Sequence, residues 1–433
     1  MRHATRLLRG ATCALTAVVL GLTAACGTSG PGSTDSGSGT IHVWALQDAQ
    51  NQPIIQAGID SYQKGGKSRL ELSTYVNDAY KQKVQVSMGS PDGPDVFFNW
   101  GGGNLGQFVR AGQVVDLTEK AAPVLDSFLP SVLATAKIDG KQYGLPMNGM
   151  QPVLLFYNKE VFTRAGLEPP ASYDQLLALV DAFKAKGITP IALAGTQGWT
   201  ELMYLEYLLD RVGGPDKFAA IAAGKAGAWR DPAVLTAAQM CQDLAKRGAF
   251  GTNFASVNYD NTGSSALFTS GKAAMQVMGS WEYSNEQSNF ADFFRSGNLG
   301  WTAFPSVAGG KGDPKNLVGN PSNYFSVRAS SKRAAEAIDF LVKTLSSDAY
   351  VSGLIKVGQV PAIKGVDAKL AGTPNAAFAT FTYNLVAGAP AFTQSWDQAL
   401  SPSVGSALLT NLQKLFLSSI TPAEFVSAME QAR

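Results

Sequence analysis

Short apolar runs and longer amphipathic runs alternate along the chain between Thr40 and Trp100. We predict strands at residues 40–45, 69–75 and 95–100, and helices at residues 53–64 and 80–88. A β-α-β-α-β order is typical of parallel strands joined by crossover helices, which bury both faces of the sheet. The chain of 433 residues is long enough for two or three domains with a substantial core.

The pattern changes after Met147. A strand is predicted at Val153–Lys159, and from Glu160 onward the sequence is mostly helical. The segment Asn316–Val327 is typical of a strand, but its centre, Asn320-Pro-Ser-Asn, is irregular. The tail from Asn375 is again predicted to be helical.

The N-terminus has the features of an export signal. Residues 1–10 are basic, and residues 11–25 are uncharged and mostly apolar, too short a run to span a bilayer. The run ends in Leu22-Thr-Ala-Ala-Cys26-Gly, which resembles a bacterial lipobox with Thr in the place of the usual Leu. That resemblance implies cleavage before Cys26, addition of a diacylglycerol to its thiol, and an anchor at the outer face of the cytoplasmic membrane. The alternative is an ordinary secretory signal with Cys26 incidental.

Residues 1–25 are therefore interpreted as a lipoprotein signal peptide, and residues 26–39 as a flexible tether. The tether is rich in Gly and Ser and has too few apolar residues to fold by itself. Without Arg2, Arg6 and Arg9, 32 basic and 33 acidic residues leave a net charge of −1. No basic stripe with interleaved aromatic residues is present, so nucleic acid is not an expected partner.

The sequence has too few cysteine and histidine residues for several kinds of site. Cys13 lies in the signal peptide and Cys26 would be acylated, so no disulfide is expected. The remaining Cys241 lies in an apolar helical pattern and is interpreted as a buried small hydrophobe. The two histidines are His3 and His42, too few for a His-based triad or a His-rich metal site. We expect no metal and no cofactor.

The third predicted strand is followed by Gly101-Gly-Gly-Asn-Leu-Gly106, a literal match to G-x-G-x-x-G. A dinucleotide site is rejected, because the match follows the third predicted strand and the following helical stretch is short. These glycines are instead interpreted as allowing a ligand or another backbone to approach the strand end.

A strand pattern at residues 271–278 ends in Gly279-Ser280, followed by Trp281 and Glu282. In open α/β sheets, ligands bind beyond the carboxyl ends of strands. An indole beside a carboxylate offers a flat apolar face for a sugar ring and acceptors for its hydroxyl groups. The alternative is that Trp281 plugs the core at the end of a strand.

Six short segments, in this order, resemble the extracellular solute-binding proteins of bacterial sugar ABC importers, the family that includes maltose-binding protein. They are Pro94-Asp-Val-Phe-Phe, Gly140-Lys-Gln-Tyr-Gly-Leu-Pro, Leu155-Phe-Tyr-Asn-Lys-Glu, Phe268-Thr-Ser-Gly-Lys-Ala-Ala-Met, Met278-Gly-Ser-Trp and Ser395-Trp-Asp-Gln-Ala-Leu. The resemblance covers the chain from Thr40 to Arg433.

The resemblance implies an α/β fold of the two-lobed, type II periplasmic-binding-protein kind, with a ligand cleft between lobes that close on a hinge. Lobe 1 would comprise residues 40–151 and 315–357. Lobe 2 would comprise residues 152–312 and 359–433.

Carried over position by position, the resemblance implies a set of cleft residues from both lobes. The aromatic platforms would be Trp199, Trp281 and Trp396, with Trp100 at the end of the third strand. Groups bonding to hydroxyls or lining the cleft would be Gln47, Asp48, Asp78, Asn99, Asn148, Gln151, Glu282, Asn320 and Asp397. Trp44, Trp229 and Trp301 are left as core or surface residues.

The expected function is capture of a di- or oligosaccharide, for which a β-linked, xylobiose-like disaccharide is the best guess, and its delivery by a monomeric receptor to a membrane permease. No catalysis is expected. The rival class is a secreted glycoside hydrolase, which would also need aromatic platforms and a pair of carboxylates in the cleft.

Overall fold

The structure is a computed structural model that describes residues 39–65 and 68–432. The expected signal peptide, most of the tether and the expected lipid site at Cys26 lie outside these residues. Within the described part of the chain, no helix combines the length and the apolar character needed to cross a bilayer.

The first sheet contains the β-α-β-α-β unit expected from the sequence. Its strand order is β2-β1-β3-β12-β6, and β1 pairs in parallel with both β2 and β3. Strands β12 and β6 complete it in antiparallel orientation. The strands are β1 (Thr40–Leu46), β2 (Arg69–Tyr75), β3 (Val96–Asn99), β6 (Leu145–Pro146) and β12 (Tyr324–Val327). The prediction of a parallel sheet is confirmed for β1, β2 and β3.

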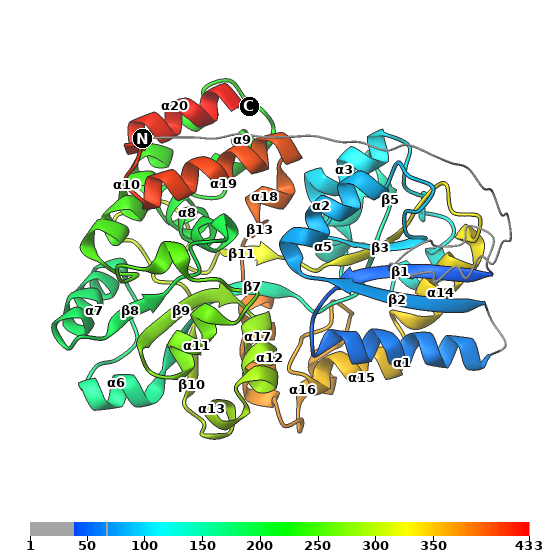
Figure 1. The fold of residues 1–433 in the computed structure, drawn as a ribbon, viewed down its shortest axis with the longest axis horizontal. Coiled ribbons are helices and arrows are strands. Elements are labelled where there is room, and N and C mark those ends of the chain that lie inside the picture. The colour runs from blue at the N-terminus through cyan, green and yellow to red at the C-terminus, as the bar shows by residue number, and fades with distance from the viewer. Residues whose placement is uncertain (1–38, 66–67, 433) are drawn as a thin grey trace, which may run out of the picture. The chain divides into compact units, whose positions relative to one another are not determined.

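The second sheet has the order β13-β11-β7-β9-β8, with β10 also paired to β7. Its central pair is antiparallel, since Leu154 of β7 faces Met278 of β9. The strands are β7 (Gln151–Asn158), β8 (Thr189–Ala192), β9 (Ala273–Gly279), β10 (Leu299–Thr302), β11 (Leu317–Asn320) and β13 (Phe392–Gln394). The strand predicted just before Trp281 is therefore confirmed as β9. In Figure 1 the blue strands belong to the first sheet and the green strands to the second.

Helices pack around each sheet. Around the first are α1 (Asn51–Lys64), α2 (Asn77–Ser87), α3 (Gly102–Arg110), α4 (Ala122–Leu125), α5 (Pro130–Leu133), α14 (Ala334–Thr344), α15 (Asp348–Lys356) and α16 (Asp367–Leu370), with the small hairpin β4 (Lys137–Ile138) and β5 (Lys141–Gln142). Around the second are α6 (Lys159–Ala165), α7 (Tyr173–Ala185), α8 (Gly198–Gly213), α9 (Asp216–Ala222), α10 (Pro232–Arg247), α11 (Gly263–Thr269), α12 (Trp281–Asn289), α13 (Ala291–Arg295), α18 (Trp396–Ala399), α19 (Pro402–Phe416) and α20 (Pro422–Ala432).

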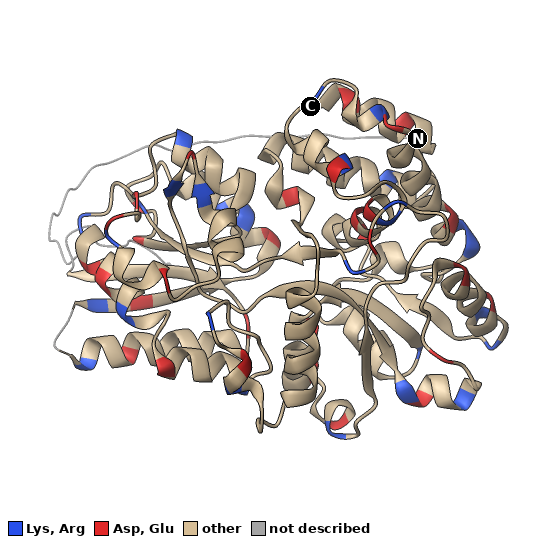
Figure 2. Ribbon diagram, turned by 180° about the vertical axis from the view of Figure 1, so that it is seen from behind, with Lys and Arg blue, Asp and Glu red and all other residues tan. Residues whose placement is uncertain are grey.

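Each sheet has its own hydrophobic core, so the chain forms two lobes. The core of lobe 1 draws on residues 41–150 and 324–370, and that of lobe 2 on residues 153–318 and 378–429. Cys241 is fully buried in the second core, as expected. We call each segment in which the chain passes from one lobe to the other a crossing. The first crossing lies between β6 and β7, where the sequence pattern changes. Charged residues of both signs are interspersed over the two lobes (Figure 2).

The later crossings lie downstream of the expected boundaries. The second was placed at residue 315, but β11 pairs with β7 and β13 in lobe 2, and only β12 joins the first sheet. The irregular centre Asn320-Pro-Ser-Asn323 is therefore the crossing itself. The third was placed at residue 359, but Val360 and Leu370 are buried in the core of lobe 1. The chain returns through α17 (Ala376–Ala387), where Phe378 packs on the core of lobe 2 and Ala379 on that of lobe 1.

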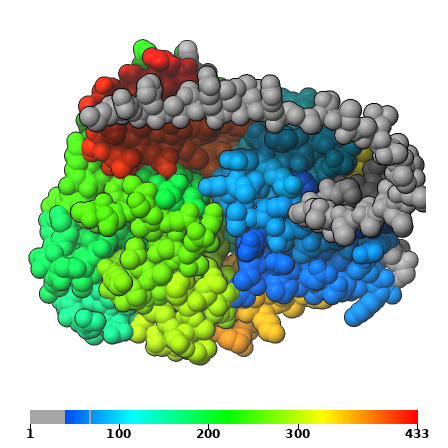
Figure 3. Space-filling view, in the orientation of Figure 1, coloured from blue at the N-terminus to red at the C-terminus, as the bar shows by residue number. Residues whose placement is uncertain are grey.

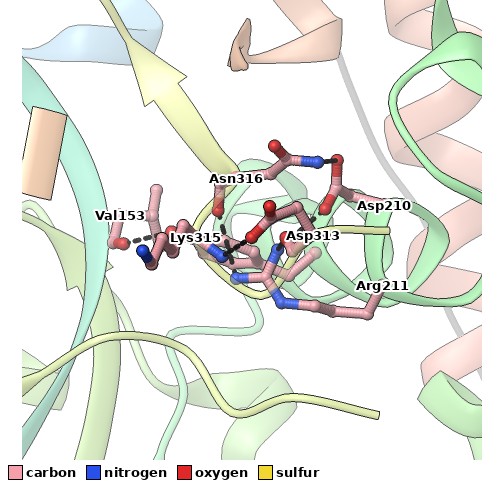
Figure 4. A network of polar contacts seen from close by, with 7 residues as sticks. Val153, Asp210, Arg211, Asp313, Lys315 and Asn316 are labelled. Carbon is pink, nitrogen blue, oxygen red and sulfur yellow. Dashed lines mark hydrogen bonds and ion pairs between the residues drawn. The ribbon is translucent and has the colours of Figure 1, made fainter. Parts of the chain in front are cut away.

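A buried ion pair fixes the segment that leads into β11 (Figure 4). Arg211 and Asp210, at the end of α8, form a 2.7 Å contact with side chains that are only 1% and 4% exposed. Arg211 also donates to the backbone oxygens of Asp313 and Asn316 at 3.3 and 3.1 Å, and the Asn316 amide donates to Asp210 at 3.1 Å. The ion pair thus holds the loop before the crossing strand against α8.

Replacing Arg211 with Ala should therefore lower the free energy of unfolding by about 3–5 kcal/mol, because it leaves the Asp210 carboxylate buried without its cation. Chemical denaturation measures the change. The control is Arg247→Ala, which removes an exposed ion pair to Asp181 and should leave stability nearly unchanged. Equal effects of the two substitutions would contradict the role assigned to Arg211.

Candidate functional site

A cavity of about 320 Å³ lies between the two lobes. Lobe 1 lines it with the loop after β1, the start of α2 and the residue after β3, and lobe 2 lines it with the first turns of α8 and α12, the loop before α11, and α18. The blue surface of lobe 1 and the green surface of lobe 2 meet in Figure 3. Most of the lobe 1 wall is thus built at the carboxyl ends of parallel strands, where α/β sheets bind ligands.

The lobe 1 wall is polar around one large ring. Asp48, in the loop after β1, accepts the backbone N–H groups of Gln50 and Asn51 at 2.8 and 3.0 Å, and the Asn51 amide at 2.9 Å. Its carboxylate therefore shapes the loop and the start of α1. Trp100, just after β3, packs edge-on against Tyr80 and Phe98, which orients its ring at the cavity.

Three aromatic side chains of lobe 2 line the opposite wall. Trp199 lies in the first turn of α8, Trp281 begins α12, and Tyr259 precedes α11. The ring centroids of Trp199 and Tyr259 are 5.2 Å apart, and those of Trp199 and Trp281 are 6.3 Å apart. Partly exposed aromatic faces in one cluster provide a stacking surface for a ring-shaped ligand.

Amide side chains at the crossings complete the cavity. Asn148 and Gln151 lie at the first crossing, and Asn320 and Asn323 at the second. The Asn323 amide donates to the Gln151 side-chain oxygen at 2.9 Å. The side-chain oxygens of Asn148, Asn320 and Asn323 are buried and have no hydrogen-bond partner within residues 39–65 and 68–432. Burying a polar atom without a partner is costly, so these atoms favour a ligand that supplies hydroxyl groups.

Direct contacts join the lobes across the cavity. The Lys81 ammonium forms a 3.0 Å ion pair with Asp397 and lies 5.3 Å from the centre of the Trp100 ring. Gln394 donates to the backbone oxygen of Trp100 at 2.6 Å. At Gly103, a Cβ atom would lie 2.2 Å from the backbone oxygen of Leu400, so the glycine-rich segment allows the backbone of lobe 2 to approach the start of α3. The structure is therefore a form with the lobes in contact.

The acidic groups at the cavity do not form an obvious catalytic pair. Partial burial raises the pKa of Asp260, the negative charge of Asp78 raises it further, and a hydrogen bond to Gln197 and the charge of Lys81 oppose this. Asp48 is held by its own loop, and Asp397 is paired with Lys81. Among the described residues, no group of three or more His, Cys, Asp or Glu side chains is arranged to hold a metal ion.

The structure brings together most of the expected site residues. Gln47, Asp48, Trp100, Asn148, Gln151, Trp199, Trp281, Asn320 and Asp397 all line the cavity. The remaining four, Asp78, Asn99, Glu282 and Trp396, do not.

Two of these four are interior residues of lobe 2. Trp396 was expected to be a stacking platform, but it is 1% exposed and stacks on Phe218 at 4.5 Å in the core. Glu282 was expected to bond to the ligand, but it is fully buried behind the aromatic wall. Both expectations placed the wrong face of a helix in the cavity.

The other two lie in lobe 1. The Asn99 side chain is turned into the lobe, where it donates to Ser326 at 2.8 Å and accepts the Gly101 N–H at 3.0 Å. Asp78 lies in the first turn of α2 and accepts the amide of its neighbour Asn77, which does line the cavity. Three further residues line the cavity although no local motif marks them in the sequence, namely Lys81, Tyr259 and Asn323.

The family described as bacterial extracellular solute-binding protein matches residues 47–351, which is more than half of the chain. The chain belongs to this family. As a solute-binding protein it has the two-lobed α/β fold that the sequence motifs led us to expect, and it is a binding protein and not an enzyme.

Relatives and solved structures extend this assignment. The multiple sugar-binding protein of Streptococcus mutans is 26% identical over 361 residues, 81% of each chain. An ABC transporter extracellular-binding protein of Pyrococcus horikoshii is 26% identical over 46% of this chain and 45% of that one, so the match spans about half of that relative. A structure from work on xylan utilization by the thermophilic bacterium Caldanaerobius polysaccharolyticus superposes with a TM-score of 0.79 at 29% identity, covering 90% of this solute-binding protein and 99% of that chain.

Gly279 allows Trp281 to adopt its position, and its replacement tests the aromatic wall. A Cβ atom at Gly279 would lie 1.8 Å from the indole ring of Trp281, so Gly279→Ala should displace that ring. We expect a changed tryptophan fluorescence and near-UV circular dichroism spectrum, and a loss of about 1–3 kcal/mol of stability.

The matched control is Gly89→Ala in lobe 1, where the nearest atom would be at an ordinary 3.6 Å. It should leave the spectra unchanged. A Gly279→Ala protein with the wild-type spectra would show that Trp281 does not lie against Gly279.

Proposed function

We propose that this solute-binding protein is the receptor of an ABC importer for a neutral disaccharide, captured between its two lobes and delivered to a membrane permease. The observation that carries the proposal is the cavity itself. Aromatic faces from lobe 2 and unpaired amide oxygens from the crossings surround one space of about 320 Å³. A sugar ring presents an apolar face for stacking and hydroxyl groups at its edge, which match these two kinds of wall.

The size of the cavity favours a short saccharide. Its volume is near the lower end of the range of about 300–1,000 Å³ for small-molecule sites. Names of relatives point in the same direction, since one is a multiple sugar-binding protein and a similar solved structure comes from work on xylan utilization. We therefore propose a β-linked, xylobiose-like disaccharide as the first ligand to test.

The proposal includes the way the protein is held and the way it works. The lipobox-like sequence ending at Cys26 supports a lipid anchor at the outer face of the cytoplasmic membrane. The receptor would act as a monomer, and the ligand would shift an equilibrium between open and closed lobes. The lobe-to-lobe contacts of Lys81 and Gln394 are the kind that would form on closure.

A glycoside hydrolase is the less supported alternative. Hydrolysis needs one carboxylic acid and one carboxylate on either side of the scissile bond. Glu282 does not line the cavity, and Asp48 and Asp397 already have partners in the protein.

Titration calorimetry and sugar analysis on the same samples separate these functions. We expect xylobiose, or another neutral β-linked disaccharide in the screen, to bind with a change in tryptophan fluorescence and to be recovered intact. New reducing ends would favour the hydrolase, and no binding of any neutral disaccharide would contradict the receptor.

Trp281→Ala should weaken the binding of that disaccharide by about 1–3 kcal/mol, because it removes a stacking face. The control is Trp301→Ala, since Trp301 packs against Tyr283 and Phe378 and does not line the cavity. It should lower stability without changing affinity. If Trp281→Ala lowered stability without changing affinity, Trp281 would be a core residue and not a stacking platform.

A further inference from the structure

A chain of hydrogen bonds runs from the aromatic wall into the interior of lobe 2. The Trp281 indole N–H donates to the Tyr259 hydroxyl oxygen at 2.9 Å, and the Tyr259 hydroxyl donates to a Glu282 carboxylate oxygen at 2.7 Å. Trp281 and Tyr259 line the cavity, whereas Glu282 is fully buried. The polar ends of both aromatic side chains are therefore occupied by the protein, and their rings remain for the ligand.

Glu282 holds a second wall residue in the same way. Its other carboxylate oxygen accepts the amide of Asn285 at 3.2 Å, and Asn285 also lines the cavity. The same oxygen accepts the Ser265 hydroxyl at 2.5 Å and the Gln276 amide at 3.4 Å, from α11 and β9. One buried carboxylate thus links three elements of lobe 2 to the wall of the cavity.

A second carboxyl group of α12 is buried, but among the described residues neither of its oxygens has a hydrogen-bond partner. Glu286, one turn further along α12, is also fully buried. Burial first, and then the charge of Glu282, raise the pKa of Glu286 well above its ordinary value. The neutral form of Glu286 is therefore favoured, and Glu286→Gln keeps this position uncharged.

We propose that Glu282 is a positioning residue, which sets the affinity for the ligand without touching it by fixing Tyr259, and through Tyr259 the ring of Trp281. The affinity part of this proposal rests on the proposed sugar-binding function. The positional part does not, since it rests on hydrogen bonds between residues of the protein.

Tyr259→Phe is the sharpest probe, because it keeps the ring and removes the hydroxyl that joins Trp281 to Glu282. We expect the Trp281 indole N–H resonance, assigned with Trp281→Phe, to shift in both Tyr259→Phe and Glu282→Gln. We expect each variant to bind xylobiose about three- to tenfold more weakly, the range of one hydrogen bond. The double variant should lose no more affinity than Tyr259→Phe alone, because both changes break one chain of contacts.

The matched control is Glu286→Gln, which changes a buried carboxyl group on the same helix that takes no part in the hydrogen bonds from Trp281 through Tyr259 to Glu282. It should leave the Trp281 resonance and the affinity unchanged. If Glu282→Gln does not fold, Tyr259→Phe still breaks the chain, because it removes the hydroxyl group that lies between Trp281 and Glu282, and its affinity for xylobiose decides the matter.

The outcomes separate the two proposals. If wild-type protein binds no xylobiose but the Trp281 resonance shifts as expected, the positional role stands and the choice of sugar is wrong. If the variants fold and the Trp281 resonance stays at its wild-type position, Glu282 is a structural residue only and the proposal is overturned. Wild-type affinity in Tyr259→Phe, with sugar bound normally by wild-type protein, would overturn it as well.

Discussion

Unpaired polar side chains buried between two lobes are the constraint on which the rest of this structure depends. Amide oxygens of Asn148, Asn320 and Asn323 lie at the two crossings, where contact between the lobes removes them from water. A buried polar atom without a partner costs free energy, and the described residues supply none for these three. In the proposed function, a ligand between the lobes donates to these oxygens, and its binding is thereby coupled to the closed form.

Lobe 2 has a rigid frame behind its side of the cavity. Helix α8 carries Trp199 in its first turn, Glu206 in its middle and Arg211 in its last turn. Glu206 accepts the backbone N–H of Trp396 at 2.7 Å, and Arg211 holds the loop before β11. One helix thus orients the aromatic wall, α18 with Asp397, and the crossing strand. The hydrogen bonds from Trp281 through Tyr259 to Glu282 hold the same stacking surface from a second side.

Much of the fold was predictable because it depends on local patterns. Alternating polarity and helix-length runs placed β1, β2 and β3, and the Gly-Ser pair correctly placed Trp281 just after a strand. The crossings were harder to place, because Asn316–Val327 has the pattern of a single strand although its two halves join different sheets. β11 and β12 are distinguished only by the distant strands with which they pair, and the local sequence pattern does not predict that pairing.

The sequence predicted which segments of the chain reach the cavity. It did not predict which side chains of those segments point into the cavity. Residues next to each other on a helix point about 100° apart, so Trp281 faces the cavity while Glu282, the next residue of α12, faces the core. The same rotation turns Trp396 inward and Asp397 toward Lys81. Tyr259 could not be identified, because its role comes from contacts with Trp199, Trp281 and Glu282.

The affinity of the Asn148→Ala protein for the disaccharide that the wild-type protein binds is the measurement that tests the central claim most directly. The Asn148 side-chain oxygen has no partner within the described chain, so its removal breaks no hydrogen bond made by that atom. We predict at least a several-fold loss of affinity by calorimetry, with no loss of stability in chemical denaturation. Unchanged affinity would contradict the claim that this buried oxygen is reserved for a ligand hydroxyl.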